Sequence, residues 1–243
     1  MNRIVLPRVQ STNTWLSQHA EGLPSLTVVT TPCQGAGRGQ RGNSWESEEG
    51  KNLNFSMLWL PGGFPAQCQF AVSEAVALAV ADTLEECGIH ARVKWPNDIY
   101  AGDSKISGIL IEHSVTGRDI TQTVIGVGLN VNQLRFISDA PNPVSMAMLT
   151  GREHSVDDVC KTLAAHIERR LQSTADPASR QALHAQYMGR LWRGDGRMHL
   201  FATPDGSRFS AAIAGVASDG MLTLMDQSGA MRTYAFKEVS FIL

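Results

Sequence analysis

The chain has 243 residues, of which 43% are hydrophobic and 18% are charged, and its formal net charge is −2. This length suffices for one sizeable core and a small second unit. The near-neutral charge disfavours a broad nucleic-acid surface. No segment approaches the roughly 20 uninterrupted apolar residues of a membrane helix, and the N-terminus has no apolar run of signal-peptide length. We therefore expect neither a nucleic-acid partner nor a membrane partner.

The four cysteines lie far apart and form no CxxC pair; they are Cys33, Cys68, Cys87 and Cys160. This spacing disfavours both a zinc ribbon and a disulfide framework. We expect a reducing, cytoplasmic location and no metal site built from protein ligands.

The first part of the chain is predicted to alternate strands and helices. Ser11 stands where an N-cap begins a helix that runs to about Ala20. The segment 66–87 is rich in alanine and valine and apolar nearly all round in its middle, which predicts a buried helix that ends at Gly88. Strands are predicted at 3–9, 26–31 and 52–60.

Strands are then predicted at 92–95, 106–113 and 123–131, pairing consecutively. Ser155 with Asp158 forms a capping box, which begins an amphipathic helix running to about Leu171, and a further helix is expected at 178–192. From Arg197 the pattern changes to short alternating strands separated by glycine turns, which predicts a small β-barrel. We divide the chain into a catalytic domain, 1–193, and a C-terminal barrel, 194–243.

The segment from Gln34 to Gly50 contains five glycines among polar residues. Its free backbone N–H groups can converge on an anion, Arg38 and Arg41 add positive charge, and Trp45 can stack on a base. The segment is not a P-loop, because no Gly-Lys-Ser/Thr follows, and no helix opens after it as in a dinucleotide fingerprint. An ordinary flexible surface loop remains the alternative.

Two later stretches also contain chemistry-bearing residues. The first is Lys94-Trp95-Pro96-Asn97-Asp98 with the following Lys105. Lys105 can bring a compact cation to an acyl phosphate, while Asp98 can orient a metal, a substrate amide or an attacking amine. The alternative is a turn followed by an exposed lysine. The strand 124–131 has two glycines on one face, where a ligand, or a packed helix, can come close.

These stretches, in this order, resemble the biotin protein ligases, that is, the biotin-[acetyl-CoA-carboxylase] ligases. Four blocks carry the resemblance: Ser11-Thr12-Asn13, Gly37-Arg38-Gly39 with Trp45, Lys94 to Asp98 with Lys105 and Gly108, and Gly126 to Asn130. The resemblance implies an α+β fold in which a mixed β-sheet is flanked by helices, as in class II synthetases and lipoate ligases. A small SH3-like barrel follows the sheet.

The resemblance also implies residue roles. Biotin is expected to contact Ser11, Thr12, Asn13, Gln34, Gly37, Arg38, Lys105, Gly108 and Gly126. ATP is expected to contact Arg38, Gln40, Arg41, Trp45, Asn97, Lys105 and Asn130. The catalytic residues are expected to be Arg38, Lys105 and Asp98.

By the same resemblance, the substrates are biotin and ATP with Mg²⁺, and biotinyl-5′-AMP forms before transfer to a lysine of a biotin carboxyl carrier protein. Three departures stand out. The Ser-Thr-Asn block begins at residue 11, which leaves no room for the DNA-binding domain of bifunctional members. Gln40 replaces a frequent arginine, and the tail 238–243 lacks a late arginine. Whether the protein forms a homodimer is left open.

Two rival functions remain. A lipoate or octanoate transferase shares the fold and the lysine, but it needs a long apolar slot, whereas Ser11, Thr12, Asn13 and Gln34 provide polar groups suited to a ureido ring. A non-catalytic biotin sensor would bind biotin without chemistry. The presence of both Arg38 and Lys105 favours an enzyme.

Overall fold

The computed structural model describes residues 2–138 and 142–243, with only the backbone of Arg41. An eight-stranded sheet forms the larger part of the molecule. Its strands are β1 (Arg3–Val5), β2 (Val28–Thr31), β3 (Leu53–Trp59), β4 (Phe64–Pro65), β5 (Ala91–Lys94), β6 (Asp98–Ala101), β7 (Ser104–Thr116) and β8 (Asp119–Leu129). They follow the order β1-β2-β3-β8-β7-β6-β5, with β4 beside β8.

The sheet is mixed because β1 and β2 run parallel while the other neighbours run antiparallel. The predicted mixed sheet is therefore confirmed. The strand expected at 3–9 is shorter, ending at Val5 before Pro7, which has no N–H to give to a ladder. Strand β6 was not predicted, because it begins at Asp98 in the Pro96-Asn97-Asp98 stretch, which by default indicates a turn. Its pairing with β7 extends to Asn97, whose Nδ2 donates to the Ile109 carbonyl oxygen at 2.8 Å.

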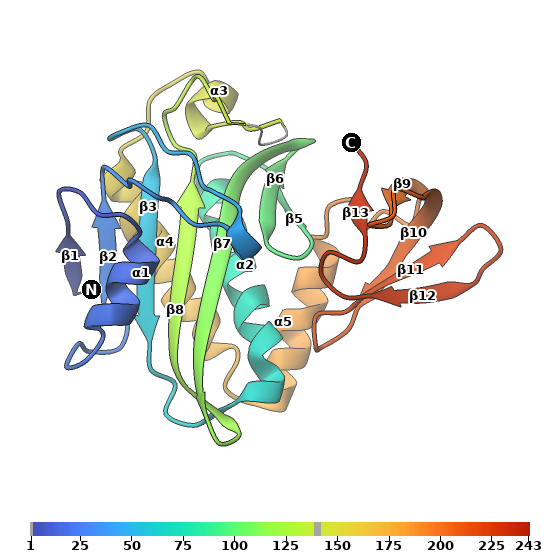
Figure 1. Cartoon of the computed structure of the whole chain (residues 1–243), viewed down its shortest axis with the longest axis horizontal. Helices are drawn as coiled ribbons and strands as arrows, with labels where there is room; N and C mark the ends of the chain where they lie inside the picture. Colours follow the sequence, from blue (N-terminus) through green and yellow to red (C-terminus); the bar gives the residue numbers. More distant parts are fainter. Residues whose placement is uncertain (1, 139–141) are drawn as a thin grey trace.

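Helices cover both faces of this sheet (Figure 1). On one face lies α1 (Thr12–His19), whose Leu16 packs with Val29 and Leu58. On the other face α2 (Gln69–Glu86) and α4 (Val156–Gln172) share the main core, and α5 (Pro177–Gly189) packs on α2. The short α3 (Met146–Thr150) follows the sheet. Across 2–138 and 142–243 no helix combines the length and the apolarity that a membrane crossing requires.

Helix α2 is buried over most of its length, as its composition predicts. Small alanine side chains let it approach the sheet closely, and Val72, Val76 and Leu78 are fully buried. It ends as predicted, with Gly88 at a φ of 77°, a conformation that glycine adopts without a Cβ penalty. The first predicted turn, Ala66–Cys68, is a 3₁₀ turn that precedes the α-helix.

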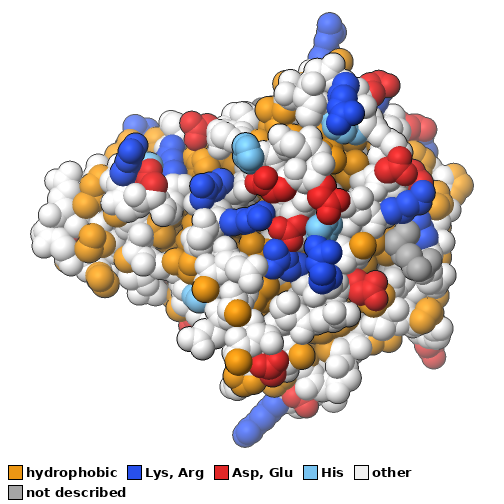
Figure 2. Space-filling model, turned by 180° about the vertical axis from the view of Figure 1, so that it is seen from behind, with side chains coloured by type: hydrophobic (Ala, Val, Ile, Leu, Met, Phe, Trp, Pro, Cys, Tyr) orange, Lys and Arg blue, Asp and Glu red, His pale blue; other side chains and the backbone are white. Residues whose placement is uncertain are grey.

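The predicted helix caps are also present. Ser11 accepts a hydrogen bond from the Thr14 N–H, and Ser155 accepts one from the Asp158 N–H at 3.2 Å. Figure 2 shows acidic and basic side chains intermingled on the face turned away from the viewer in Figure 1. Ion pairs of this kind join the helices, as between Arg170 of α4 and Asp82 of α2 at 2.6 Å. They tie neighbouring helices together at their polar edges.

A second, five-stranded antiparallel sheet forms the C-terminal part, seen beside the large sheet in Figure 1. Its strands are β9 (His199–Ala202), β10 (Arg208–Val216), β11 (Leu222–Asp226), β12 (Met231–Tyr234) and β13 (Ser240–Phe241), in the order β12-β11-β10-β9-β13. The sheet is consistent with the expected SH3-like module. It is joined to the first sheet by Trp95, whose Nε1 donates to the Gly220 carbonyl oxygen at 2.8 Å.

We predict that Leu78→Ala lowers the free energy of unfolding by about 2–5 kcal/mol, because Leu78 is fully buried in α2 and its loss leaves a cavity. Urea denaturation measures the change. Leu134→Ala is the matched control, since Leu134 is 65% exposed, and it should change stability by less than about 0.5 kcal/mol. Equal losses in the two variants would contradict this account of the core.

Candidate functional site

A cavity of about 400 Å³ opens on the face of the large sheet that also carries α1. Segments far apart in the sequence line it: the start of α1, the glycine loop, the 94–98 block, the middle of β7 and β8, and the C-terminal segment 236–241. The described members of these segments include many of the predicted residues, namely Ser11, Thr12, Asn13, Gln34, Arg38, Gln40, Trp45, Asn97, Asp98, Lys105, Gly108 and Gly126.

One end of the cavity is a chain of buried polar groups. Thr12 donates from its backbone N–H to Gln34 Oε1 at 3.0 Å, which ties the start of α1 to the start of the glycine loop. Ser56 of β3 donates to Thr12 Oγ1 at 2.8 Å and lies 2.5 Å from Asn13 Oδ1. These side chains hold one another in fixed orientations, because each donor finds an acceptor within the chain.

Two glycines of β8 form the floor. A Cβ at Gly126 would lie 2.3 Å from Asn13 Oδ1, and a Cβ at Gly128 would lie 2.3 Å from Trp45 Cε2. Neither approach is possible for any residue with a side chain. The close neighbours of these glycines are therefore side chains of α1 and of the glycine loop, and a ligand beside this strand stays a prediction.

Trp45 lies flat over this floor. Its ring contacts Gly108 of β7, where a Cβ would be 3.2 Å from Cζ3, and Lys105 Nζ lies 5.9 Å from the ring centroid. The indole Nε1 is buried and has no hydrogen-bond partner among the described residues. The glycine loop thus closes on the sheet through this side chain.

The other end of the cavity is cationic and is organised by Asp98. Its carboxylate lies 2.6 Å from Lys105 Nζ and 3.6 Å from Lys94 Nζ. Lys94 is further enclosed by the rings of Tyr100 and Phe241, at 5.1 and 5.4 Å from their centroids. Burial lowers the pKa of Lys94, opposed by the nearby Asp98 carboxylate. Two ammonium groups therefore share one carboxylate, which leaves local positive charge for an anionic ligand.

Arg38 adds a third cation at the cavity wall. Its Nη2 lies 2.8 Å from Glu112 Oε1 of β7, and its Nη1 donates to Thr14 Oγ1 at 3.2 Å. The guanidinium is therefore fixed on one side by α1 and β7, although about half of the side chain is exposed.

Some predicted residues lie elsewhere. Asn130 is outside the described lining, because its buried amide donates to the Val144 carbonyl oxygen at 3.0 Å, while its Oδ1 has no partner among the described residues. Gly37 also lies behind the wall, and its carbonyl accepts from the Trp45 N–H at 2.9 Å. The side chain of Arg41 falls outside the described residues.

Other lining residues were not predicted. Asn54 lines the cavity, and Ser56 lies just beyond the lining. Both are buried polar residues on the same face of the otherwise apolar strand β3. This alternation of polar and apolar residues is a signal that could have indicated them. Lys94 lies in the 94–98 block, where the sequence indicates no separate role for it. The C-terminal Lys237 and Phe241 lie at the cavity because the second sheet packs against the first. No local sequence pattern predicts that contact.

The cavity joins a polar, hydrogen-bonding end to a cationic end across a flat floor. Such a site suits a ligand with a polar head group and an anionic tail, and it can hold two anionic groups close together. Asp98 is the one carboxylate among the described lining residues.

Comparisons of the sequence and of the structure with known proteins both find ligases. Residues 5–130 match the Biotin/lipoate A/B protein ligase family. The bifunctional ligase/repressor BirA of Escherichia coli (strain K12) is 32% identical over 240 residues, covering 97% of this chain and 73% of that protein. The biotin–[acetyl-CoA-carboxylase] ligase of Paracoccus denitrificans is 36% identical over 160 residues, covering 63% of this chain and 65% of that protein.

Among solved structures, the biotin protein ligase from Aquifex aeolicus in complex with biotin and ATP superimposes with a TM-score of 0.81 and 25% identity, covering 98% of this chain and 97% of that one. The family match takes in just over half of the chain, and it contains the polar end, the glycine floor and the Asp98–Lys105 pair. The chain therefore belongs to the Biotin/lipoate A/B protein ligase family.

Proposed function

We propose that the protein is a biotin protein ligase, which activates biotin with ATP to biotinyl-5′-AMP and transfers the biotinyl group to a lysine of a biotin carboxyl carrier protein. The observation that carries this proposal is the union of a polar end around Thr12 and Asn13 with a cationic end around Lys105 in one cavity. The named relatives, which are ligases of this kind, support it.

In this proposal the bicyclic ureido head of biotin lies at the polar end, where Ser11, Thr12, Asn13 and Gln34 offer donors and acceptors. The valeryl carboxylate then points to the cationic end, and the nucleotide lies beside Trp45, Gln40 and Asn97. Arg38 and Lys105 reduce the repulsion between the carboxylate and the triphosphate. Attack by the carboxylate oxygen on the α-phosphorus forms the acyl phosphate bond and releases pyrophosphate.

In the second step the amine of a carrier lysine attacks the acyl carbon, the C–N bond forms and AMP leaves. Asp98 is suited to orient that amine, because Lys105 and Lys94 hold its carboxylate at the cavity. Trp45 and the loop above the floor keep water from the mixed anhydride until the carrier arrives.

Mg²⁺ belongs to this proposal as the counter-ion of the triphosphate, where it would neutralise phosphate charge. The described residues of the lining do not provide an oxygen cage for it, since their single carboxylate already pairs with two lysines. The division into a catalytic domain, 1–193, and a C-terminal module, 194–243, is part of the same proposal. The C-terminal module adds Lys237 and Phe241 to the rim.

The direct test is to incubate the purified protein with ATP, Mg²⁺ and either biotin, lipoate or octanoate, followed by mass spectrometry of the denatured mixture. We expect biotinyl-5′-adenylate and pyrophosphate with biotin alone, and subsequent transfer to one lysine of an added carrier domain. Lipoyl-adenylate as the main product would assign the protein to the lipoate branch. Biotin binding without pyrophosphate release would make it a sensor.

For the cationic end, we predict that Lys105→Ala lowers the rate constant of adenylate formation by about 100-fold, with a smaller effect on biotin affinity. The reason is that the ammonium group should matter most as negative charge shifts onto the phosphoryl oxygens. Rapid-mixing kinetics separates the two effects. Lys161→Ala removes an exposed lysine paired with Asp157 on α4 and serves as the control. An unchanged rate constant with weaker biotin binding would give Lys105 a binding role only.

For the polar end, we predict that Gly126→Ala weakens biotin binding by about tenfold, because the new methyl group displaces the Asn13 amide from its hydrogen bonds. Titration calorimetry measures the affinity. Gly189→Ala is the matched control, since a Cβ at the end of α5 meets nothing within 4 Å. Normal affinity in a folded Gly126→Ala protein would place the ureido ring elsewhere.

A further inference from the structure

Glu112 lies on β7, just behind the cavity wall, and belongs to none of the motifs that identify the site. Its two carboxylate oxygens serve two different lining residues. Oε1 accepts from Arg38 Nη2 of the glycine loop at 2.8 Å, and Oε2 accepts from Asn13 Nδ2 of α1 at 3.0 Å and, more weakly, from Arg38 Nη1 at 3.5 Å. One carboxylate thus joins the cationic wall of the cavity to its polar end.

The contact with Arg38 fixes a side chain that would otherwise move. A long arginine side chain loses considerable rotamer freedom when it is held, and about half of this one is exposed. Glu112 and Thr14 bind the terminal nitrogens, while a guanidinium has five N–H donors in all. Donors therefore remain for a ligand in the cavity while the carboxylate holds the group in place.

The contact with Asn13 fixes the direction of an amide. Nδ2 donates both to Glu112 and to the Leu110 carbonyl oxygen at 3.2 Å, so Oδ1 must face Ser56 and the floor at Gly126. A flipped amide would bring two acceptors together on the side of Glu112 and lose both bonds. The acceptor that the polar end offers is thus set by Glu112 together with the Leu110 carbonyl oxygen.

We propose that Glu112 is a positioning residue for adenylate formation, which holds Arg38 and Asn13 in the orientations in which they contact biotin. The proposal rests on the proposed function, because it assumes that biotin lies between these residues. The pair with Arg38 is too exposed to contribute much to folding, so the effect of Glu112 should appear in substrate binding and in the rate, with little change in stability.

A double-mutant cycle tests the proposal. Adenylate formation is measured in the full-length protein, in Glu112→Gln, in Arg38→Ala and in the double variant. Gln keeps the size and an acceptor for Asn13 but loses the charge-assisted pair. We expect Glu112→Gln to lower the specificity constant for biotin by about tenfold while Tm changes little. In the Arg38→Ala background the same change should have little further effect.

Glu85→Gln is the matched control, since Glu85, near the C-terminal end of α2, has the exposed His90 as its one ion-pair partner among the described residues. It should leave the rate unchanged. Additive losses in the cycle, or a loss of activity that follows a fall in Tm, would overturn the proposal and leave Glu112 with a structural role.

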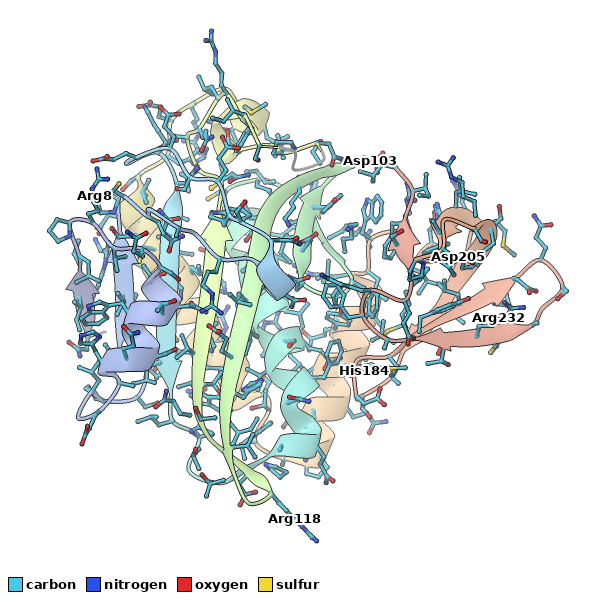
Figure 3. The ribbon with its side chains drawn as sticks, viewed as in Figure 1. Arg8, Asp103, Arg118, His184, Asp205 and Arg232 are labelled. Carbon is cyan, nitrogen blue, oxygen red and sulfur yellow. The ribbon has the colours of Figure 1, made fainter. Side chains whose placement is uncertain are left out.

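Chemical modification of Arg38 tests the same contact without relying on biotin. Phenylglyoxal reacts with free guanidinium groups, and Arg118, which projects from the β7–β8 hairpin in Figure 3, gives the rate for an unhindered arginine in the same sample. We expect Arg38 to react more slowly than Arg118, and faster in Glu112→Gln than in the unmodified sequence. Equal rates in the two proteins would refute the positioning role, whereas an absence of adenylate with slow Arg38 modification would refute only the proposed function.

Discussion

The site depends on one steric constraint, the absence of side chains on the central strand β8 at Gly126 and Gly128. Only there can the Asn13 amide and the Trp45 ring rest directly on the sheet, and both would clash with any Cβ. The polar end and the loop are therefore placed by contact with the central strand of the large sheet. A site built on strands holds its geometry more closely than one built on loops alone.

Around this floor, a few carboxylates pair with the cationic side chains. Asp98 holds Lys94 and Lys105, and Glu112 holds Arg38, so these three cations have a carboxylate partner before any substrate is present. Such pairing keeps the cations in position and reduces the cost of gathering like charges. An anionic ligand then meets donors that are already oriented, and little reorganisation is needed when charge develops during the reaction.

Much of this could be predicted from the sequence. Local signals were sufficient for α1, α2 and α4, because caps and apolar periodicity are properties of neighbouring residues, and the four motif blocks placed Arg38, Asp98 and Lys105 together. What was not predicted depends on contacts between distant segments. Strand β6 begins in a stretch whose local sequence indicates a turn, and its pairing with β7 overrides that signal. Glu112 acquires its partners from α1 and the loop, and Asn130 donates to Val144 because the backbone after β8 supplies an acceptor there.

The arrangement of Phe241 against Lys94 has a thermodynamic consequence. The last strand of the C-terminal sheet supplies a ring to the same lysine that pairs with Asp98, and Arg193 Nη1 donates to the Ile242 carbonyl oxygen at 2.8 Å. Attachment of the second sheet and completion of the cavity are therefore one coupled equilibrium. By linkage, any ligand that needs the complete cavity must also strengthen that attachment, and the stabilisation grows with the logarithm of the ratio of free ligand concentration to Kd once the ligand is in excess. The stability of the contact between the second sheet and the first should therefore rise when a ligand fills the cavity, although most of the cavity is built by the first sheet.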